Sequence, residues 1–251
     1  MIYGIFSDVH ANLTALEAVL ISMDSHGVEL RASLGDIVGY GPDVNQCVSL
    51  VSREAANSVL GNHDNVALGR ESSRQFNRLA REAILWTRGQ LSQESSEYLS
   101  GLPLLDTVSS CTLVHGLPSN PAGWRYLEYG ADAKDAAMAI DTCLCACGHT
   151  HRPALYHAPA DVWPVKVDIA AAGSSVVEYG PLTLDGGKVI FCVGAVGQPR
   201  NYDSRASWCL VDTGRMTIEY VRVPYDVASV QRRMELAGLP APLISRLGEG
   251  C

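Results

Sequence analysis

Five short segments between residues 8 and 151 carry side chains that bind metal ions or transfer protons, and they read DVH, GD, GNHD, HG and GHTH. Their candidate metal ligands are two carboxylates, one amide oxygen and four imidazoles, namely Asp8, Asp36, Asn62, His10, His115, His149 and His151. A set of oxygen and imidazole ligands without thiolates suits divalent transition metals of intermediate hardness. There are too many ligands for one tetrahedral ion. Their number fits two ions that share a bridging carboxylate.

Each segment directly follows an apolar run that is typical of a buried strand, and these runs are IYGIF, LRASL, NSVL, CTLV and CLCAC. In an open α/β sheet, ligands bind beyond the carboxyl ends of the strands. Gly35, Gly61 and Gly148 stand just before the ligands, where glycine permits a tight turn or a close backbone approach. We therefore expect the five segments to meet at one edge, with Thr150 pointing away between two histidines that reach different metals.

The first 150 residues alternate such strands with helical patterns, which favours a mostly parallel sheet covered on both faces. Helices are expected over about 43–52 and 131–140, and a pair of helices over about 74–101. The pair lies in an insertion of about 65–105 that we expect to form a helical cap over the site. Asn12 precedes the first helix and is either its N-cap or a substrate contact.

The pattern changes after Pro153, where short strands alternate with turn signals such as Thr213-Gly214. We expect these strands, over about 154–223, to form a second, antiparallel sheet packed on the first. Helices are expected over about 226–248. No internal repeat or flexible linker interrupts the pattern, so we expect residues 1–251 to fold as a single α/β domain.

The charge and composition of the chain indicate which kinds of partner it binds and in which cellular compartment it acts. The formal net charge is −8, so we expect no stable nucleic-acid binding, while bound cations would still permit anionic substrates. The N-terminal apolar run ends at Phe6, which is too short for a signal peptide or a membrane span. The eight cysteines lack the spacing of a structural zinc site and are expected to be buried, reduced thiols. These features predict a cytoplasmic protein with no membrane partner.

Taken in this order, the five motifs resemble those of the calcineurin-like metallophosphoesterase superfamily. The stretches GYGPD at residues 39–43 and GAVGQPR at residues 194–200 extend the likeness to the longer bacterial and archaeal phosphoesterases of this superfamily. The resemblance implies an α/β sandwich of two packed mixed sheets flanked by helices, with a helical cap insertion. It also implies a hydrolase that uses two divalent metal ions.

The resemblance assigns a role to each candidate ligand. By this resemblance, Asp8, His10 and His151 would bind the first metal ion. Asn62, His115 and His149 would bind the second ion, and Asp36 would bridge the two. Mn, Fe, Ni, Co and Zn all tolerate such sites, and we favour manganese. As a hypothesis, a hydroxide bridging the two metals attacks phosphorus in line. His63 is expected to be protonated and to face the leaving-group oxygen, with Asp64 orienting its ring.

One position departs from the protein Ser/Thr phosphatases of the superfamily. They carry GDxVDRG, whereas this chain has GDIVGYG, so Tyr40 stands where a phosphate-clamping arginine is found. Arg125, Arg200 and Arg205 are candidate replacements, and we favour Arg200 together with Tyr40 and Asn12 as substrate contacts. Small phosphodiester or nucleotide-type substrates are therefore expected. The alternatives are a phosphomonoesterase or Ser/Thr protein phosphatase-like activity, and a non-catalytic protein-binding scaffold of the same fold.

Overall fold

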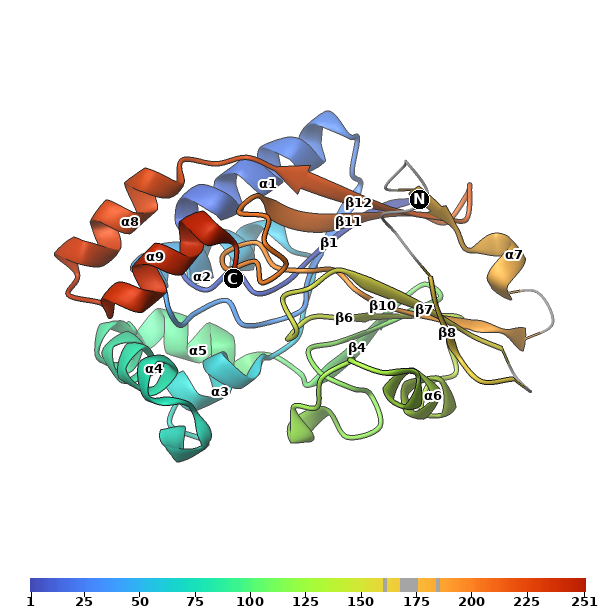
Figure 1. Cartoon of the computed structure of the whole chain (residues 1–251), viewed down its shortest axis with the longest axis horizontal. Helices are drawn as coiled ribbons and strands as arrows, with labels where there is room; N and C mark the ends of the chain where they lie inside the picture. The colour runs from blue at the N-terminus through green and yellow to red at the C-terminus, as the bar shows by residue number, and fades with distance from the viewer. Residues whose placement is uncertain (160–161, 168–175, 184–185) are drawn as a thin grey trace.

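Two mixed sheets face each other at the centre of the molecule (Figure 1). The computed structural model describes residues 1–159, 162–167, 176–183 and 186–251. The first sheet has the strand order β3 (Asn57–Ser58), β2 (Leu30–Ser33), β1 (Ile2–Phe6), β11 (Ala206–Asp212), β12 (Thr217–Val223) and β9 (Val176–Glu178). The second has the order β4 (Leu105–Val108), β5 (Cys111–Val114), β6 (Leu144–Cys147), β10 (Lys188–Cys192), β7 (Ala154–Ala158) and β8 (Val165–Val167). The expected fold class, a sandwich of two mixed sheets flanked by helices, is confirmed.

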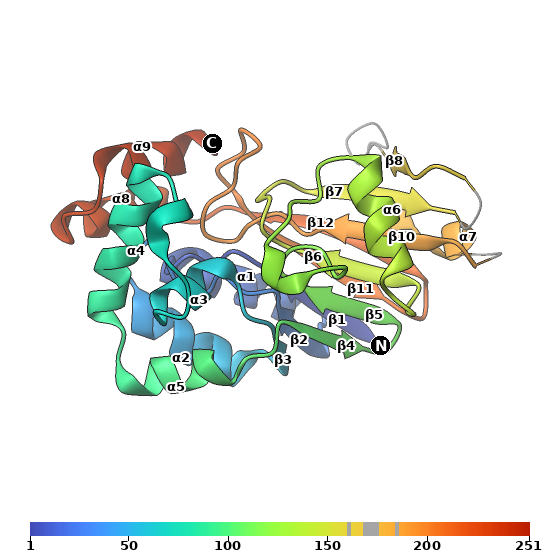
Figure 2. The ribbon, with the colours of Figure 1, turned by 90° about the horizontal axis from the view of Figure 1, so that it is seen from below.

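The main core lies between the sheets. Buried side chains such as Ile5 and Leu34 from the first sheet pack with Leu113 and Phe191 from the second. The outer face of each sheet is covered by helices, because α1 (Leu13–Ser25) packs on β11 and β12, and α6 (Gly130–Met138) packs on β7 and β10. Figure 2 shows α6 lying across the second sheet.

The remaining helices gather mainly at one end of the sheets (Figure 2). Their bounds are α2 (Val44–Glu54), α3 (Asn62–Ala67), α4 (Arg78–Gln90), α5 (Gln93–Gly101), α8 (Val227–Leu236) and α9 (Ala241–Glu249), with a short 3-10 helix η1 (Ser73–Gln75) before α4. Buried residues of α4, α8 and α9, including Ala83, Met234 and Leu243, form one apolar cluster with Tyr40. The expected helices over 74–101 and 226–248 are therefore present, and they pack beside a motif residue.

The strands after Pro153 do not form a sheet of their own, so that expectation was wrong. β9, β11 and β12 belong to the first sheet, and β7, β8 and β10 belong to the second. The reason is that a central strand needs hydrogen-bond partners on both edges: β1 pairs with β2 on one side and β11 on the other, and β6 pairs with β5 and β10. The mixed character of both sheets follows from these pairings.

Two other expectations concern the segment between β8 and β10. The apolar stretch after Tyr179, expected as strand, begins with the short helix α7 (Gly180–Thr183). The expected strand residues 168–175 lie outside the described part of the chain. Within the described residues, no helix has the length and apolar character needed to cross a bilayer.

Candidate metal centre

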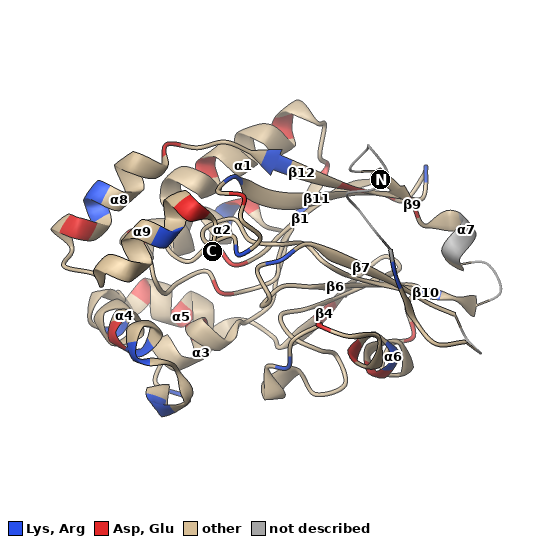
Figure 3. Ribbon diagram, viewed as in Figure 1, with Lys and Arg blue, Asp and Glu red and all other residues tan. Residues whose placement is uncertain are grey.

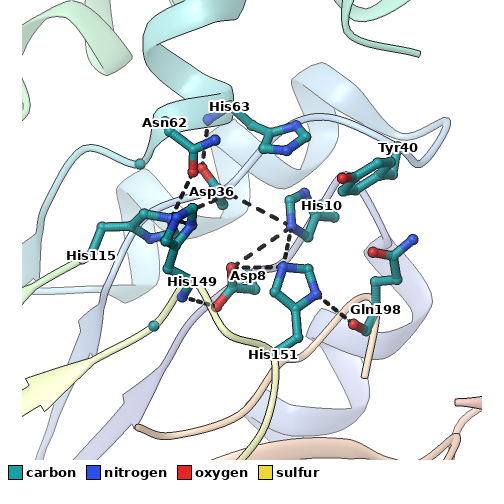
Figure 4. A network of polar contacts seen from close by, with 12 residues as sticks. Asp8, His10, Asp36, Tyr40, Asn62, His63, His115, His149, His151 and Gln198 are labelled. Atoms are coloured by element: carbon teal, nitrogen blue, oxygen red, sulfur yellow. Dashed lines mark hydrogen bonds and ion pairs between the residues drawn. The ribbon is translucent and has the colours of Figure 1, made fainter. Parts of the chain in front are cut away.

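The five motifs meet where strands of both sheets end. Asp8 and Asp36 follow β1 and β2, Asn62 opens α3, His115 follows β5, and His149 and His151 follow β6. Figure 4 shows their side chains pointing toward one another. Potential ligand atoms of Asp8, His10, Asp36 and His151 lie within 4.8 Å of one another, and those of Asp36, His115 and His149 form a second such group. Asp36 belongs to both groups, as a bridging ligand would.

Asn62 joins the second group through its amide oxygen, which lies 3.1 Å from His115 Nε2. All seven predicted ligands are therefore brought together, and all are buried. Thr150 takes no part, because its hydroxyl instead donates to the Arg152 carbonyl oxygen at 3.1 Å. This agrees with its expected orientation away from the centre.

Backbone carbonyl groups set the orientation of all four imidazoles. His10, His115 and His151 each contact a carbonyl oxygen through Nδ1, at 3.1, 2.8 and 2.6 Å, and His149 does so through Nε2 at 2.8 Å. Since a carbonyl oxygen only accepts, the contacting nitrogen of each ring carries the proton. In the neutral form of each ring, the other nitrogen presents a lone pair to the centre, as in histidines that bind metals.

Those lone pairs face one another at short range. His10 Nε2 lies 3.2 Å from His151 Nε2, and His115 Nε2 lies 3.1 Å from His149 Nδ1. Two buried oxygens, Oδ1 of Asp8 and Oδ2 of Asp36, accept no hydrogen bond from the described residues, although His151 Nε2 lies 3.2 Å from the first and His115 Nε2 lies 3.3 Å from the second. Buried acceptors without donors are costly unless a cation satisfies them. The donor set therefore fits two divalent cations.

The ionisation of the ligands suits cation binding, with one exception. Burial raises the pKa of Asp36, but the neighbouring imidazoles of His115 and His63 outweigh it and hold that pKa well below its usual range. Burial lowers the pKa of His149 to about 3 and that of His10 well below its usual value. Burial also disfavours the charged form of His115, but the Asp36 carboxylate beside it raises the pKa to about 9. A cation must therefore displace a proton from His115.

The ligand loops adopt a strained backbone conformation. Five ligands have left-handed φ values between 48° and 68°, namely Asp8, His10, Asp36, His149 and His151. Such conformations are uncommon for residues other than glycine and cluster at functional sites. Gly61 is required for another reason, because a Cβ there would lie 2.1 Å from Asp36 Oδ1. This is the close approach expected from the sequence.

The backbone of the GAVGQPR stretch, residues 194–200, packs against the loops that carry Asp8 and His151. Gly197 packs so tightly on the first ligand loop that a Cβ would lie 1.8 Å from the Val9 carbonyl oxygen. Its backbone N–H donates to the Asp8 carbonyl oxygen at 2.8 Å, and the Gln198 carbonyl oxygen accepts from His151. The backbone of this motif therefore positions metal ligands, a role that side-chain chemistry does not reveal.

His63 lies at the edge of the metal centre, but it does not contact Asp64 as expected. Both carboxylate oxygens of Asp64 accept backbone hydrogen bonds, from Val38 N at 3.0 Å and from Gly61 N at 3.1 Å. His63 Nδ1 is buried and has no partner among the described residues. Asp64 thus fixes the ligand loops, and the ring of His63 is oriented by its packing against Phe76 and Tyr40, with ring centroids 4.6 Å away in both cases.

The protonation state of His63 before a substrate binds follows from its burial. Burial lowers its pKa to about 4, although the Asp36 carboxylate opposes this effect. The imidazole is therefore neutral at pH 7 in the free protein rather than protonated. A neutral ring still donates one hydrogen bond, and an anion bound beside it would raise its pKa.

A cavity of about 420 Å³ opens over the metal centre and His63. Gln75, Phe76 and Asn77 from the expected cap line it, together with Tyr40 and two arginines, Arg200 and Arg246. Arg246 comes from α9 and was missed, because no local pattern connects a C-terminal helix with motifs near the N-terminus. The other two candidate clamps are engaged elsewhere: Arg125 pairs with Asp132 and Asp135, and Arg205 pairs with Asp203.

Asn12 has its side chain engaged within the fold. Its Oδ1 accepts from Ala15 N at 3.1 Å, which caps α1, and its Nδ2 donates to the Gly197 carbonyl oxygen at 3.1 Å. The side chain is 1% exposed. Of its two expected roles, the structure supports the helix cap, and we do not carry Asn12 forward as a substrate contact.

Comparison with known proteins gives the same assignment as the geometry. The model of the calcineurin-like phosphoesterase superfamily domain matches residues 1–216. The chain belongs to this superfamily. A calcineurin-like fold with two clusters of aspartate and histidine supports a metal-dependent phosphoesterase.

Similar proteins extend this relationship over the full chain. The crystal structure of a metallophosphoesterase from Sphaerobacter thermophilus is 41% identical, with a TM-score of 0.84, and the match covers 100% of this chain and 99% of that one. An uncharacterized protein of Methanocaldococcus jannaschii is 34% identical over 97% of this chain and 96% of its own length. A hypothetical protein from Pyrococcus horikoshii OT3 is 18% identical, covers 100% of this chain and 98% of its own, and shares the fold with a TM-score of 0.75.

Proposed function

We propose that this chain is a dinuclear metal-dependent phosphoesterase that hydrolyses small phosphodiester or nucleotide-type substrates. The observation that carries the proposal is the pair of ligand groups that share Asp36 beneath a cavity containing His63 and two arginines. Asp8, His10 and His151 would bind one ion, and Asn62, His115 and His149 would bind the other. Manganese is favoured because the carboxylate and amide oxygens suit it and no thiolate selects a softer metal, and the imidazoles would also accept Fe, Ni, Co or Zn.

The chain's own residues supply binding and proton transfer. Bound divalent cations would acidify a water molecule and neutralise charge on the phosphoryl oxygens. Arg200 and Arg246 line the same cavity, so their guanidinium groups are placed to bind further phosphoryl oxygens. His63 would donate a hydrogen bond to the leaving-group oxygen, and the bound phosphate would favour its protonated form. Tyr40, whose hydroxyl lies 3.4 Å from Arg200 Nη2, would orient that arginine.

The test of the proposed His63 role compares two histidine variants. His63→Ala should lower turnover by about 10²–10⁴-fold while both metals stay bound, because only proton donation is lost. His26→Ala, a change at an exposed histidine after α1, should leave turnover and metal content unchanged. Turnover is measured with added manganese, and bound metal by plasma mass spectrometry. Full turnover by metal-loaded His63→Ala would contradict the assignment.

One observation also supports a second candidate activity, the hydrolysis of phosphomonoesters. Two guanidinium groups in one cavity suit the dianion of a monoester as well as a diester. Comparing kcat/KM for bis-p-nitrophenyl phosphate and p-nitrophenyl phosphate separates the two. We expect the diester or nucleotide substrates to be preferred, and dominant turnover of the simple monoester would reverse this choice.

We also propose that the protein acts in a reducing compartment, the cytoplasm. All eight cysteines carry free thiols, and six of them are buried. Thiol labelling of the unfolded protein, taken directly from cells, should therefore modify all eight, and recovery of a disulfide-bonded form would contradict the proposal.

A further inference from the structure

A second cavity of about 440 Å³ adjoins the one over the metal centre, and Tyr126 and Arg200 line both. Its other walls come from the GHTH loop and β7, including Thr150, Arg152 and Tyr156, and from Lys166 on β8. Each cavity by itself has the size typical of small-ligand pockets. A substrate that reaches the metals through the first cavity can therefore extend into the second past Arg200.

The walls of this adjoining cavity are rich in unpaired positive charge. Arg152, Lys166 and Arg200 line it, and none of the three forms an ion pair with a carboxylate in the described part of the chain. Among the described residues that line it, Glu128 is the single acidic one. By contrast, α4, α6 and α8 each carry basic and acidic residues together (Figure 3). Three such cations are notable in a chain whose net charge is −8.

The two arginines are held in place with hydrogen-bonding capacity to spare. Arg152 Nε donates to the Arg200 carbonyl oxygen at 2.7 Å, and its two terminal nitrogens form no hydrogen bond with the residues that the structure describes. Arg200 Nε is buried without a hydrogen-bond partner among the described residues. Lys166 Nζ lies 5.9 Å from the centre of the Tyr156 ring. Positioned cations without acidic partners are the groups that bind phosphate.

We propose that the adjoining cavity binds the leaving group of the substrate, whether the cleaved bond is a phosphoester or a phosphoanhydride, and that this leaving group carries a phosphate of its own. The inference rests on the proposed function and specifies its substrate class as compounds with two phosphoryl groups, such as nucleoside diphosphates. With ADP, a water oxygen would form a bond to the β-phosphorus, and the bond from that phosphorus to the bridging oxygen would break. Phosphate and AMP would be released, and they share the protons of the water. Arg152 and Lys166 would bind the phosphate of the departing AMP.

The experiment uses a matched pair of substrates and a matched pair of double variants. AMP and ADP both contain adenosine, but only ADP has a leaving group that bears a phosphate. Arg152→Gln/Lys166→Gln removes the two proposed contacts, and Arg53→Gln/Arg232→Gln removes two exposed charges outside both cavities. The first double variant should lower the ratio of kcat/KM for ADP to that for AMP by about tenfold or more. The control should leave the ratio unchanged.

A binding measurement separates this inference from the proposed function. Adenosine 5′-(α,β-methylene)diphosphate cannot be cleaved at the bridging position, so calorimetry on the manganese-loaded protein reports its affinity without turnover. The Arg152→Gln/Lys166→Gln variant should bind it about tenfold more weakly than the control does. Unchanged affinity and an unchanged ratio in an active enzyme would overturn the inference alone. Absence of hydrolysis of every ester by the metal-loaded wild type would overturn the proposed function, and the binding result would still decide whether this cavity takes a phosphate.

Discussion

Asp64 accepts two backbone hydrogen bonds from the loops that carry Asp36 and Asn62, and it does not touch His63. Removing a buried acceptor leaves its donors unsatisfied, at about 1–3 kcal/mol for each. We therefore expect Asp64→Ala to lower the free energy of unfolding by about 2–5 kcal/mol, and Asp64→Asn by less, since one acceptor oxygen remains. Urea denaturation measures both. If Asp64→Asn instead kept full stability and lost only turnover, a role in orienting His63 would be restored.

We expect His115 to make metal binding depend on pH. Because the Asp36 carboxylate raises the pKa of His115 to about 9, outweighing burial, the metal-free imidazole is protonated below that pH and must lose its proton when a cation binds. Apparent metal affinity should rise with pH up to about 9, and loading at pH 7.5 should release about one proton from this residue. Calorimetric titration of manganese in buffers of different ionisation enthalpy counts the protons. If the wild type released no proton on binding manganese, the assignment to His115 would be contradicted.

At the scale of elements, the sequence predicted helices and ligand loops better than it predicted which strands pair with one another. The sequence identified the ligand loops and the helices α4 and α5, because the spacing of apolar residues and glycines that marks them lies within a few consecutive residues. The distribution of β7–β12 between two sheets was not, because it depends on which strand edge is free in the folded molecule. Arg246 was missed for a similar reason, since α9 reaches the cavity only through its packing on α8 and α4. The left-handed backbone of five ligands could not be predicted either, because Asp and His adopt this conformation more often than most residues but do not require it.

Gly61 lies between the end of β3 and the start of α3. A substitution at this position tests how closely the backbone must approach Asp36. A Cβ at this position would lie 2.1 Å from Asp36 Oδ1 and 2.2 Å from Asp36 N, so the shared ligand would be displaced. Gly61→Ala should therefore lower the content of both metals sharply. Gly89→Ala is the matched control, because a Cβ there meets nothing within 4 Å. Since alanine favours the helical conformation of α4 more than glycine does, this variant should raise the free energy of unfolding by about 0.5–1 kcal/mol. Plasma mass spectrometry and thermal denaturation compare the two, and full metal content in Gly61→Ala would refute the argument.

At the scale of the whole molecule, the candidate metal ligands come from both sheets. The first ligand group combines Asp8, His10 and Asp36, which follow strands of the first sheet, with His151, which follows β6 of the second. The second group likewise joins Asp36 to His115 and His149. Each bound cation would therefore hold the sheets together at the end where the strands stop and the cavity opens. Such a ligand stabilises the folded protein, because the unfolded chain offers no preformed site.

Removing the metals should accordingly lower the melting temperature of the whole domain. Each ion present at 100 times its dissociation constant contributes about 2.7 kcal/mol, and a chain of this size shifts by about 2–4 °C for each kcal/mol, so we expect removal of both ions by a chelator to lower Tm by about 10–20 °C. Scanning calorimetry of manganese-loaded and chelator-treated protein measures this shift. Asp36→Asn removes the ligand common to both groups and should melt at the same temperature in either state, whereas His26→Ala should keep the full shift. If wild-type protein with two bound ions melted no higher than the metal-free form, the cations would not be linking the sheets.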